Sequence, residues 1–451
     1  MKPRPEIPSG PYLVVGLARS GIAAAHALRE RGEEVIGVDA GAPSGLDSLA
    51  ADGVEVHVGE GGANLLDRVG AVVKSPGVPR TAPVIAAARR RELPVLGELE
   101  LAWRMLENEF IAVTGTNGKT TTVELIGHIH REAALPVAVA GNVGAAVSGL
   151  VGTIDENATV VCEASSFQLE DTLAFAPEAA VLLNISPDHL DRHGTLDAYA
   201  EAKLNVFARQ DEDDLAVAPS ALLARGLGRD AEPIGGRMGK ARRILFGSGP
   251  GDALLERDGE LSWNGRPLLA RRELRLRGGH NVENAMAAAA VCLERGIARD
   301  AVVAGLVSFA GVAHRLEEVT LSGGVTYVND SKATNVASTL VALDAFAEES
   351  GIHLILGGRG KGQDFTPLRA AVEGNCRTVY VIGEDAPAIA RALAGGRVPV
   401  RECGDLQAAV EEARRAAVDG EVVLLSPACA SFDQFADFEA RGERFRELVG
   451  S

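Results

Sequence analysis

The segment VTGTNGKTTTVELIG, residues 113–127, places glycines, a lysine and hydroxyl side chains in an order that can hold nucleotide phosphates. The usual phosphate loop reads G-x-x-x-x-G-K-[ST]. Here position 113 is valine, so the loop is the shorter G-x-x-G-K-T of residues 115–120. A strand pattern precedes it and a helix pattern follows it, and the N–H groups and dipole at a helix N-terminus favour an anion. We expect the shortened loop to bind ATP.

Lys119 can reach the β- and γ-phosphates from this loop, and the Thr120 hydroxyl can bind Mg²⁺. The alternative is a plain strand–loop–helix connection with an incidental G-K-T, which leaves the three consecutive threonines unexplained. The residues expected to bind ATP here are Gly115, Thr116, Asn117, Gly118, Lys119, Thr120, Thr121 and Thr122.

Two further segments, CEASSFQL and NISPDHLDRHG, carry side chains that suit a metal site. Glu163 lies near the end of one predicted strand, and His189 follows another. Ligands bind at the carboxyl ends of parallel strands, and Mg²⁺ takes few protein ligands besides phosphate oxygens. Both side chains are therefore candidates for a site with Mg²⁺ and ATP, although either histidine of DHLDRH can also be a non-functional residue. The residues next to Lys203 in the sequence, AYAEAKLNVF, indicate only an ordinary lysine on a helix.

The segment GLARSG, residues 16–21, suggests a dinucleotide site, with Asp39 at the end of the next predicted strand. However, the glycine that lets the backbone approach a pyrophosphate in G-x-G-x-x-G is Ala18 here. A nucleotide-sugar phosphate fits the same helix N-terminus at least as well, because the helix dipole does not distinguish the two ligands. KSPGV, residues 74–78, would be the facing loop.

The last third of the chain combines strand ends or loops with Lys, Arg, Asp and Ser in four segments: GVAHRLEEV, VNDSKATN, LGGRGKGQDF and SPACASFDQFADFEARG. Arg315, Lys332 and Lys361 supply the local positive charge that a protein of net charge −17 needs to hold anions. Cys429 has no partner histidine nearby in the sequence, so we interpret it as a packed thiol.

The composition excludes several classes of function. The 451 residues include 45 Lys plus Arg against 62 Asp plus Glu, a balance that argues against broad nucleic-acid or anionic-membrane binding. The N-terminus has no apolar signal region, and no segment approaches 18 uninterrupted apolar residues. Five dispersed cysteines form no C-x-x-C pair and predict neither a disulfide framework nor a thiolate zinc site. We expect a cytoplasmic protein.

The elements that must position these residues alternate between β-rich runs and helical patterns, as is typical of parallel α/β domains. Three blocks separate. The first contains YLVVGL, EVIGVD and AVVK; the second begins near GELELAW (97–103) and contains FIAVTG, VVCEAS and AAVLLNIS; the third follows FAGVAHRLEEV (309–319) and contains VTYVND, IHLILGG, TVYVIG and EVVLLSP. An alanine-rich helix, residues 280–296, closes the second block.

Together these motifs resemble the Mur ligases, ATP-dependent amide-forming enzymes of peptidoglycan precursor synthesis. The resemblance covers nearly the whole chain, in order and spacing: TGTNGKTT, EASSFQL, DHLDRHG, G-x-H-N-x-x-N (278–284), HRLE, NDSKATN, GGRGKGQDF and SPACASFDQF. NDSKATN and SPACASFDQF point to the member that adds D-glutamate. The D-N-P-R motif expected of the member that adds diaminopimelate or lysine is absent.

The resemblance implies an α/β fold of three domains: a Rossmann-like UDP-binding domain (1–97), a central P-loop ATPase-type domain (98–311) and a Rossmann-like C-terminal domain that binds the amino acid (312–451). It implies ATP-dependent addition of D-glutamate to UDP-N-acetylmuramoyl-L-alanine through an acyl phosphate, releasing ADP and phosphate. It also implies two Mg²⁺ ions, with a CO₂-derived carbamate on Lys203. We expect a monomer.

The resemblance also assigns roles to individual residues. The catalytic set is Lys119, Glu163, His189 and Lys203, and the metal set is Thr120, Glu163, His189 and Lys203. ATP would also contact Asn281, Arg315 and Asp330. The UDP-sugar would contact Ser20, Asp39, Ser75, Asn142, Ser165 and Gln168, and D-glutamate would contact Thr334, Lys361, Ser431, Phe432 and Phe438.

Alternatives to this interpretation fall into two groups. Another Mur-type ligase or a folylpolyglutamate synthase would share the ATP machinery, but the motifs of the third block argue against both. Outside the class, a P-loop regulatory NTPase would hydrolyse nucleotide without cosubstrates, and a nucleotide-sugar dehydrogenase would bind NAD(H) despite Ala18.

Overall fold

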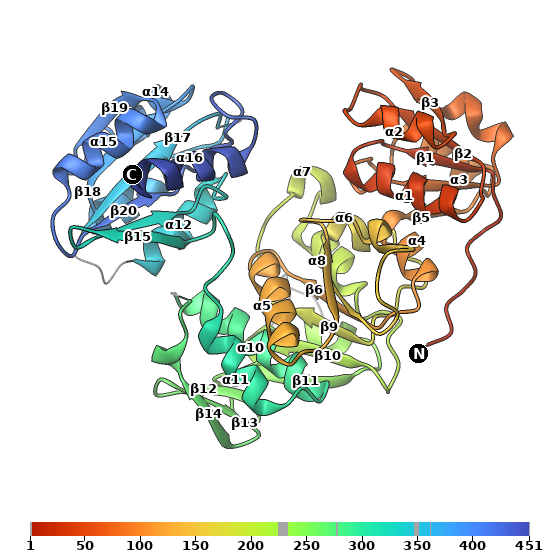
Figure 1. Cartoon of the computed structure of the whole chain (residues 1–451), viewed down its shortest axis with the longest axis horizontal. Coiled ribbons are helices and arrows are strands. Elements are labelled where there is room, and N and C mark those ends of the chain that lie inside the picture. The colour runs from red at the N-terminus through yellow and green to blue at the C-terminus, as the bar shows by residue number, and fades with distance from the viewer. Residues whose placement is uncertain (1, 224–232, 277, 347–350, 361, 451) are drawn as a thin grey trace. The chain divides into compact units, whose positions relative to one another are not determined.

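The computed structural model describes residues 2–223, 233–276, 278–346, 351–360 and 362–450, which form three sheets (Figure 1). The chain divides into two compact units. Unit 1 comprises residues 1–273 and 283–308, and unit 2 comprises residues 274–282 and 309–451. Unit 1 holds the first two sheets, and unit 2 holds the third.

The first sheet has five parallel strands in the order β3-β2-β1-β4-β5. Apolar side chains of β1 alternate between two cores: Tyr12 and Val14 pack with α1, whereas Leu13 and Val15 pack with α3. The strand order reverses direction at β1, and such a switch point opens a crevice for ligands. The elements are β1 (Tyr12–Val15), α1 (Arg19–Glu30), β2 (Val35–Asp39), α2 (Leu46–Ala51), β3 (Glu55–Val58), β4 (Ala71–Lys74), α3 (Pro83–Arg90) and β5 (Val95–Gly97).

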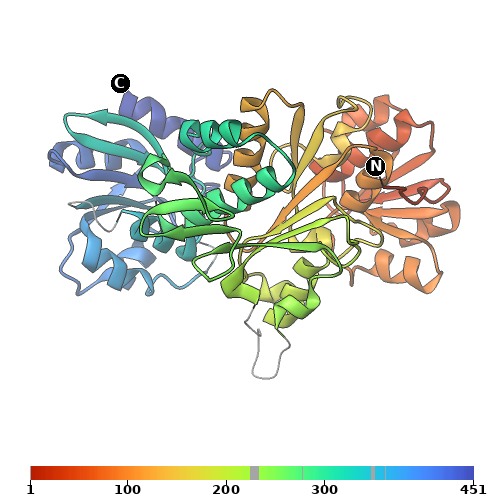
Figure 2. The ribbon, with the colours of Figure 1, turned by 90° about the horizontal axis from the view of Figure 1, so that it is seen from below.

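The second sheet has nine strands in the order β14-β13-β12-β11-β10-β9-β6-β8-β7. The colours of Figure 2 locate this part of the chain, which runs from orange through yellow to green. Strands β6 to β12 are parallel to their neighbours, and β12, β13 and β14 form an antiparallel extension. The strands are β6 (Phe110–Thr114), β7 (Val137–Gly141), β8 (Thr159–Glu163), β9 (Ala179–Leu182), β10 (Leu215–Pro219), β11 (Arg242–Gly247), β12 (Leu254–Arg257), β13 (Glu260–Trp263) and β14 (Arg266–Ala270).

Helices cover this second sheet, and two of them approach each other closely. A side chain at Gly305 of α11 would lie 2.7 Å from Ile129 of α5, so only glycine allows this packing. The helices of this part are α4 (Glu98–Met105), α5 (Lys119–Glu132), α6 (Ser166–Leu169), α7 (Leu190–His193), α8 (Leu196–Leu204), α9 (Ser220–Leu223), α10 (Gly279–Glu294) and α11 (Arg299–Ser308).

The third sheet has the order β15-β16-β20-β17-β18-β19, with only β15 antiparallel. One face packs on α12–α14 and the other on α15 and α16. The elements are β15 (Glu317–Ser322), β16 (Val325–Asn329), α12 (Val336–Ala345), β17 (Ile352–Gly357), α13 (Leu368–Asn375), β18 (Cys376–Ile382), α14 (Ala386–Leu393), β19 (Val400–Gly404), α15 (Leu406–Ala416), β20 (Val422–Leu425) and α16 (Phe438–Gly450).

The predicted α/β class is confirmed, and each quoted strand run forms a strand, usually a residue or two shorter than the apolar run. The alternation typical of parallel α/β domains did not reveal the antiparallel strands β13, β14 and β15. Strands β13 and β14 are short and carry charged residues, so their apolar pattern is weak. All five cysteines are free thiols. In the described ranges, no helix has the length and apolar character needed to cross a membrane.

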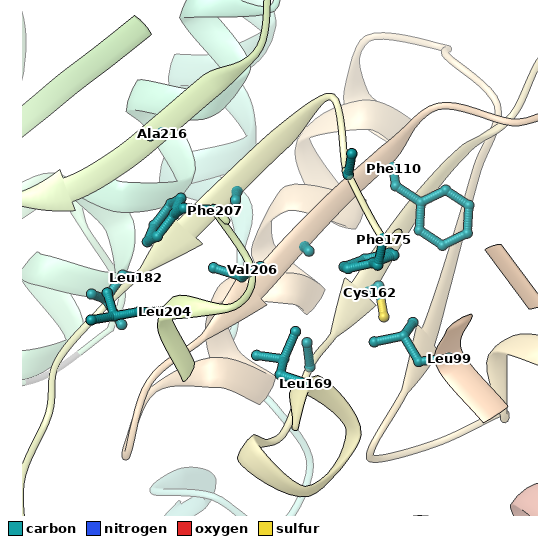
Figure 3. Packing of buried hydrophobic residues seen from close by; sticks show 14 of the residues in the cluster. Leu99, Phe110, Cys162, Leu169, Phe175, Leu182, Leu204, Val206, Phe207 and Ala216 are labelled. Carbon is teal, nitrogen blue, oxygen red and sulfur yellow. The ribbon is translucent and has the colours of Figure 1, made fainter. Parts of the chain in front are cut away.

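An aromatic cluster lies in the core of unit 1, near the start of β6. Trp103 and Phe110 each meet Phe175 edge to face, with centroid distances of 5.8 and 6.1 Å. Figure 3 shows Phe110, Phe175 and Cys162 packed side by side. This cluster supports the sheet from which the phosphate loop departs.

We predict that Phe175→Ala lowers the free energy of unfolding of unit 1 by about 3–5 kcal/mol, because it leaves a cavity in a close-packed core. Both tryptophans, Trp103 and Trp263, lie in unit 1, so urea unfolding followed by tryptophan fluorescence reports on it. Leu173→Ala is the matched control, because Leu173 is two residues away and 52% exposed. Equal effects of the two substitutions would contradict the proposed role of the cluster.

Candidate active site

The shortened phosphate loop connects β6 to α5 and is braced by its neighbours. Gly118 has φ +87°, and a side chain there would lie 2.2 Å from the Asn284 side-chain oxygen. Asn184 accepts a hydrogen bond from the Asn117 N–H (2.9 Å) at its side chain and from the Thr116 N–H (3.0 Å) at its carbonyl. Both constraints fix the loop in the absence of the usual first glycine.

The Lys119 side chain folds back over this loop. Its Nζ donates to the carbonyl oxygens of Gly115 and Thr116, both at 2.9 Å. The ammonium therefore lies directly over the backbone turn that precedes α5, where the helix N-terminus already favours an anion.

A buried carboxylate connects the phosphate loop to the neighbouring strands. Glu163, at the end of β8, is 2% exposed. Its Oε2 accepts from the Thr120 hydroxyl (2.8 Å), and its Oε1 accepts from the Asn142 side-chain amide (3.0 Å). A hydroxyl and a carboxylate held together are hard oxygen donors of the kind that Mg²⁺ prefers.

Lys203 of α8 is directed at the same loop. It is 1% exposed, its Nζ donates to the Gly115 carbonyl (2.8 Å), and it lies 4.5 Å from the centroid of the Tyr199 ring. Burial lowers the pKa of Lys203 to about 6, with a further contribution from the charge of Lys119. The amine is therefore largely neutral at pH 7, in contrast to a solvated helix lysine.

His189 is placed differently from the other predicted catalytic residues. It is exposed, has φ +50°, and lies 4.9 Å from the ring of Phe167 and 6.5 Å from that of Tyr199. Tyr199 thus lies next to both His189 and Lys203. In the described part of the chain, no group of three His, Cys, Asp or Glu side chains could hold a metal. Any Mg²⁺ here would need oxygen ligands beyond such side chains, for example those of a nucleotide.

A pocket of about 320 Å³ lies between the first sheet and the second, within unit 1. It collects five of the six residues predicted to bind the UDP-sugar: Ser20, Asp39, Ser75, Asn142 and Gln168. The sixth, Ser165, forms a capping box with Gln168 at the start of α6. Other lining residues are Gly16, Ala18, Arg19, Pro76, Gly77 and Val78.

The walls of this pocket are formed by tight backbone turns. A side chain at Gly21 would lie 1.8 Å from the Gly16 carbonyl, so α1 can start here only with glycine. Ser75 donates to that same carbonyl (2.6 Å). Asp39 accepts from the backbone N–H groups of Leu17 and Gly41, both at 2.7 Å, so its carboxylate shapes the loop as well as lining the pocket.

Sequence reasoning missed a buried ion pair behind the pocket. Lys74 Nζ lies 2.6 Å from Asp171 Oδ2, and both side chains are at most 3% exposed. Lys74 also donates to the Val78 carbonyl (2.7 Å). Burial lowers the pKa of Lys74 and raises that of Asp171, while their attraction opposes both shifts. A lysine ending an otherwise apolar strand run was the only signal available in the sequence.

The remaining predicted ATP residues, Asn281, Arg315 and Asp330, belong to unit 2. Asp330 is buried after β16, where it accepts from the Ser426 hydroxyl (2.8 Å) and the Leu316 N–H (3.2 Å). Burial raises the pKa of Asp330 to about 7.

The residues predicted to bind D-glutamate also lie in unit 2, on loops that follow strands. Thr334 follows β16, whereas Ser431 follows β20 and is 2% exposed. Phe438 begins α16, and its carbonyl accepts from the Ser331 hydroxyl (2.8 Å). Phe432 is 59% exposed. Lys361 lies outside the described residues.

Three α/β domains, with a phosphate loop on the central one and a polar pocket beside it, define the architecture of a Mur-type ligase. Sequence profiles match residues 11–97 (Mur ligase MurD-like, N-terminal domain), 113–228 (Mur ligase middle domain) and 314–429 (Mur ligase, glutamate ligase domain). The chain belongs to the Mur ligase family.

Individual relatives agree with this assignment. UDP-N-acetylmuramoylalanine–D-glutamate ligase of Anaeromyxobacter dehalogenans is 44% identical, covering 99% of this chain and 98% of the relative. The enzyme of that name from Myxococcus xanthus is 43% identical, covering 97% of each chain. The solved UDP-N-acetylmuramate-alanine ligase of Thermotoga maritima has a similar fold, with a TM-score of 0.61 at 21% identity, covering 98% of this chain and 99% of that one.

We predict that Lys74→Met lowers the free energy of unfolding of unit 1 by up to about 3–5 kcal/mol, because it removes the nearest partner of the buried Asp171 and leaves only Arg80 at 3.5 Å and Arg89 at 3.8 Å. The double variant Lys74→Met/Asp171→Leu should recover most of this loss. Urea unfolding followed by tryptophan fluorescence measures both.

Glu55→Gln provides the matched comparison, because it breaks an exposed ion pair with Arg68 in the same domain. It should leave the unfolding transition almost unchanged, since exposed pairs contribute little. A Lys74→Met protein as stable as Glu55→Gln would show that the buried pair does not hold the pocket wall.

Proposed function

We propose that this chain adds D-glutamate to UDP-N-acetylmuramoyl-L-alanine with hydrolysis of ATP to ADP and phosphate, in peptidoglycan precursor synthesis. The names of the full-length relatives support this activity. The observation that carries it is the hydrogen-bonded connection Asn142–Glu163–Thr120, which leads from the pocket to the phosphate loop. A UDP-sugar in the pocket would extend its alanine carboxylate along this connection toward the γ-phosphate of ATP.

The chemistry explains why the two sites must be adjacent. A free carboxylate is a poor acyl donor at pH 7, so its oxygen attacks the γ-phosphorus and ADP leaves. The neutral amine of D-glutamate then attacks the carbonyl carbon of the acyl phosphate, and the tetrahedral intermediate expels phosphate. Phosphoryl transfer needs positioning and charge neutralisation more than covalent help from the protein.

Residues of this chain would provide that neutralisation. Lys119 would balance charge on the transferring phosphoryl group. Thr120 and Glu163 would hold one Mg²⁺, and His189 with Lys203 would hold a second. These ions would supply electrostatic stabilisation of the phosphate oxygens. The loop residues Gly115, Thr116, Asn117, Gly118, Thr121 and Thr122 would bind phosphates, and Asn281, Arg315 and Asp330 would contact the rest of ATP.

The two remaining substrates would bind to separate sets of residues. Ser20, Asp39, Ser75, Asn142, Ser165 and Gln168 would bind the UDP-sugar, and Thr334, Lys361, Ser431, Phe432 and Phe438 would surround D-glutamate. The domain boundaries 1–97, 98–311 and 312–451, the monomeric state and the cytoplasmic location remain predictions.

We also propose that Lys203 carries a carbamate formed with CO₂. The buried position supports this, because an ammonium beside the Lys119 ammonium would be repelled and would also repel a metal. A carbamate requires the neutral amine as its precursor and offers an anionic oxygen in place of the positive charge. The depressed pKa of Lys203 is consistent with that chemistry.

The carbamate should be visible by ¹³C NMR of the native enzyme in labelled bicarbonate, as one carbonyl signal that Lys203→Arg removes. Lys240→Arg is the control and should keep the signal, since Lys240 is exposed. An active wild-type enzyme without the signal, or a signal that survives Lys203→Arg, would contradict the assignment.

The proposed activity itself is tested by phosphate release with UDP-N-acetylmuramoyl-L-alanine, ATP and a panel of D- and L-amino acids. D-Glutamate should give the highest rate, and omission of either cosubstrate should abolish release. Lys119→Ala should lower kcat/KM by about a hundredfold or more, the scale of one lost electrostatic donor in an active site.

Two outcomes would refute the proposal. Phosphate release from ATP alone at the full rate would indicate a regulatory NTPase. Preference for another amino acid would indicate a different member of the family.

A further inference from the structure

Arg441 of α16 is a fully buried guanidinium whose hydrogen-bond acceptors are all uncharged. It is 1% exposed, and no ion pair involves it among the described residues. Burial lowers the pKa of Arg441 to about 10, so the side chain stays charged at neutral pH. The charges of Asp433 and Asp330 favour the charged guanidinium, but neither carboxylate forms an ion pair with it in the described part of the chain. A buried cation without an ion pair is costly, and an apolar side chain of similar size would often be more stable. The free-energy cost of burying Arg441 suggests that its side chain does more than fill space in the core.

The acceptors of Arg441 lie at three different loops of unit 2. Its Nε donates to the Ser331 hydroxyl (2.9 Å), and its Nη2 donates to the Ser331 carbonyl (2.8 Å) and the Cys429 carbonyl (3.0 Å). Its Nη1 lies 3.4 Å from the Gly357 carbonyl. These residues stand at the carboxyl ends of β16, β20 and β17, which are adjacent in the sheet.

Two of these loops, those after β16 and β20, carry described residues of the predicted amino-acid site. Thr334 lies three residues after Ser331, and Ser431 lies two residues after Cys429. The Ser331 hydroxyl that accepts from Arg441 donates in turn to the Phe438 carbonyl (2.8 Å). One side chain therefore fixes the backbone from which three of the predicted contacts project.

The backbone next to Cys429, whose carbonyl accepts a hydrogen bond from Arg441, has a strained conformation. The hydrogen bond from Arg441 therefore helps to hold that conformation. Ala428, next to Cys429, has φ +58°, a conformation that costs a residue with a side chain free energy unless its surroundings impose it. The Ala428 carbonyl accepts from the Gln363 amide (2.5 Å), and the Cys429 carbonyl accepts from Arg441. The planar guanidinium of arginine, whose donors form a rigid fork, can hold several carbonyl groups at once because these donors are fixed relative to one another.

We propose that Arg441 is the positioning residue of the amino-acid site: it holds the loops after β16, β17 and β20 and places a fixed positive charge beneath them that selects a dicarboxylic amino acid. The inference rests on the proposed function. It predicts two separable contributions, one from the geometry of the fork and one from the charge.

Steady-state kinetics of Arg441→Lys and Arg441→Met separate these contributions. Lysine keeps the charge and loses the fork, so the KM for D-glutamate should rise about tenfold, and about a hundredfold for methionine, the range expected for hydrogen bonds to a charged group. The KM for the UDP-sugar, whose pocket lies in unit 1, should change less than about twofold. The KM for ATP should rise less than that for D-glutamate, because Asp330 is hydrogen-bonded to Ser426 and Leu316 and is affected by Arg441 only through its charge and its neighbour Ser331.

Arg444→Lys and Arg444→Met are the matched controls on the same helix. Arg444 is partly exposed and donates hydrogen bonds to Glu447 and Gln407, so both variants should behave as wild type. Circular dichroism and melting temperature establish that each variant is folded. If Arg441→Met does not fold, Arg441→Lys decides, because it retains the charge and most of the volume.

The outcomes distinguish this inference from the proposed function. An equal rise in all three KM values, or an unchanged KM for D-glutamate in a folded Arg441 variant, would overturn the positioning role. If wild-type enzyme prefers another amino acid, the proposed function fails. The KM for that amino acid then tests Arg441: a selective rise supports the positioning role, and no rise rejects it.

Discussion

The structure of unit 1 depends on the buried carboxylate of Glu163. Its strand, β8, lies between β6 and β7, and Glu163 pairs in register with Val113 on one side and Gly141 on the other. The close approach to β7 requires glycine, since a side chain at Gly141 would lie 2.3 Å from the Glu163 carbonyl. A buried carboxylate must have both oxygens satisfied, and here one oxygen holds Thr120 of the phosphate loop and the other holds Asn142 of the pocket. The hydrogen bonds of Glu163 thus connect the phosphate loop to the pocket.

A second constraint arises where two lysines share one acceptor. The Gly115 carbonyl accepts from both Lys119 and Lys203, which brings two amines together next to a helix N-terminus. Burial lowers the pKa of Lys203, and the nearby positive charge of Lys119 lowers it further. The region is therefore prepared for anions before any is bound, even though the protein carries a net charge of −17. Net charge is a sum over the whole chain, whereas an anion at this loop would respond to the nearby charge of Lys119 and to the helix N-terminus.

The sequence predicted those parts of the site that are local. The strand–loop–helix around Lys119 and the positions of Glu163 and Thr120 could be predicted, because the pattern and the strand ends lie within a few residues of each other. The contacts that could not be predicted join distant positions: Lys74 with Asp171, and Arg441 with Ser331. The burial of Lys203 was also invisible, since a helix lysine is usually solvated. Strands β13 and β14 were missed because each has a shorter apolar run than the buried parallel strands. The family resemblance supplied roles for residues whose local sequence gave none, and those roles remain predictions.

Lys74 and Arg441 stabilise loops in the same way in two domains of the chain. Each is a buried cation near the carboxyl end of a parallel sheet, and each donates to backbone carbonyls of the loops that follow the strands, Val78 in one case and Cys429 in the other. Loops at strand ends lack the ladder of hydrogen bonds that fixes the strands themselves, so their carbonyl groups need other donors. A cation provides several donors from one side chain and adds a field that favours anionic ligands. Both loops are expected to face anionic substrates, a nucleotide-sugar and a dicarboxylic amino acid. One buried cation can therefore both hold the loop and favour an anionic ligand next to the loop. These two contributions offset the free-energy cost of burying the cation.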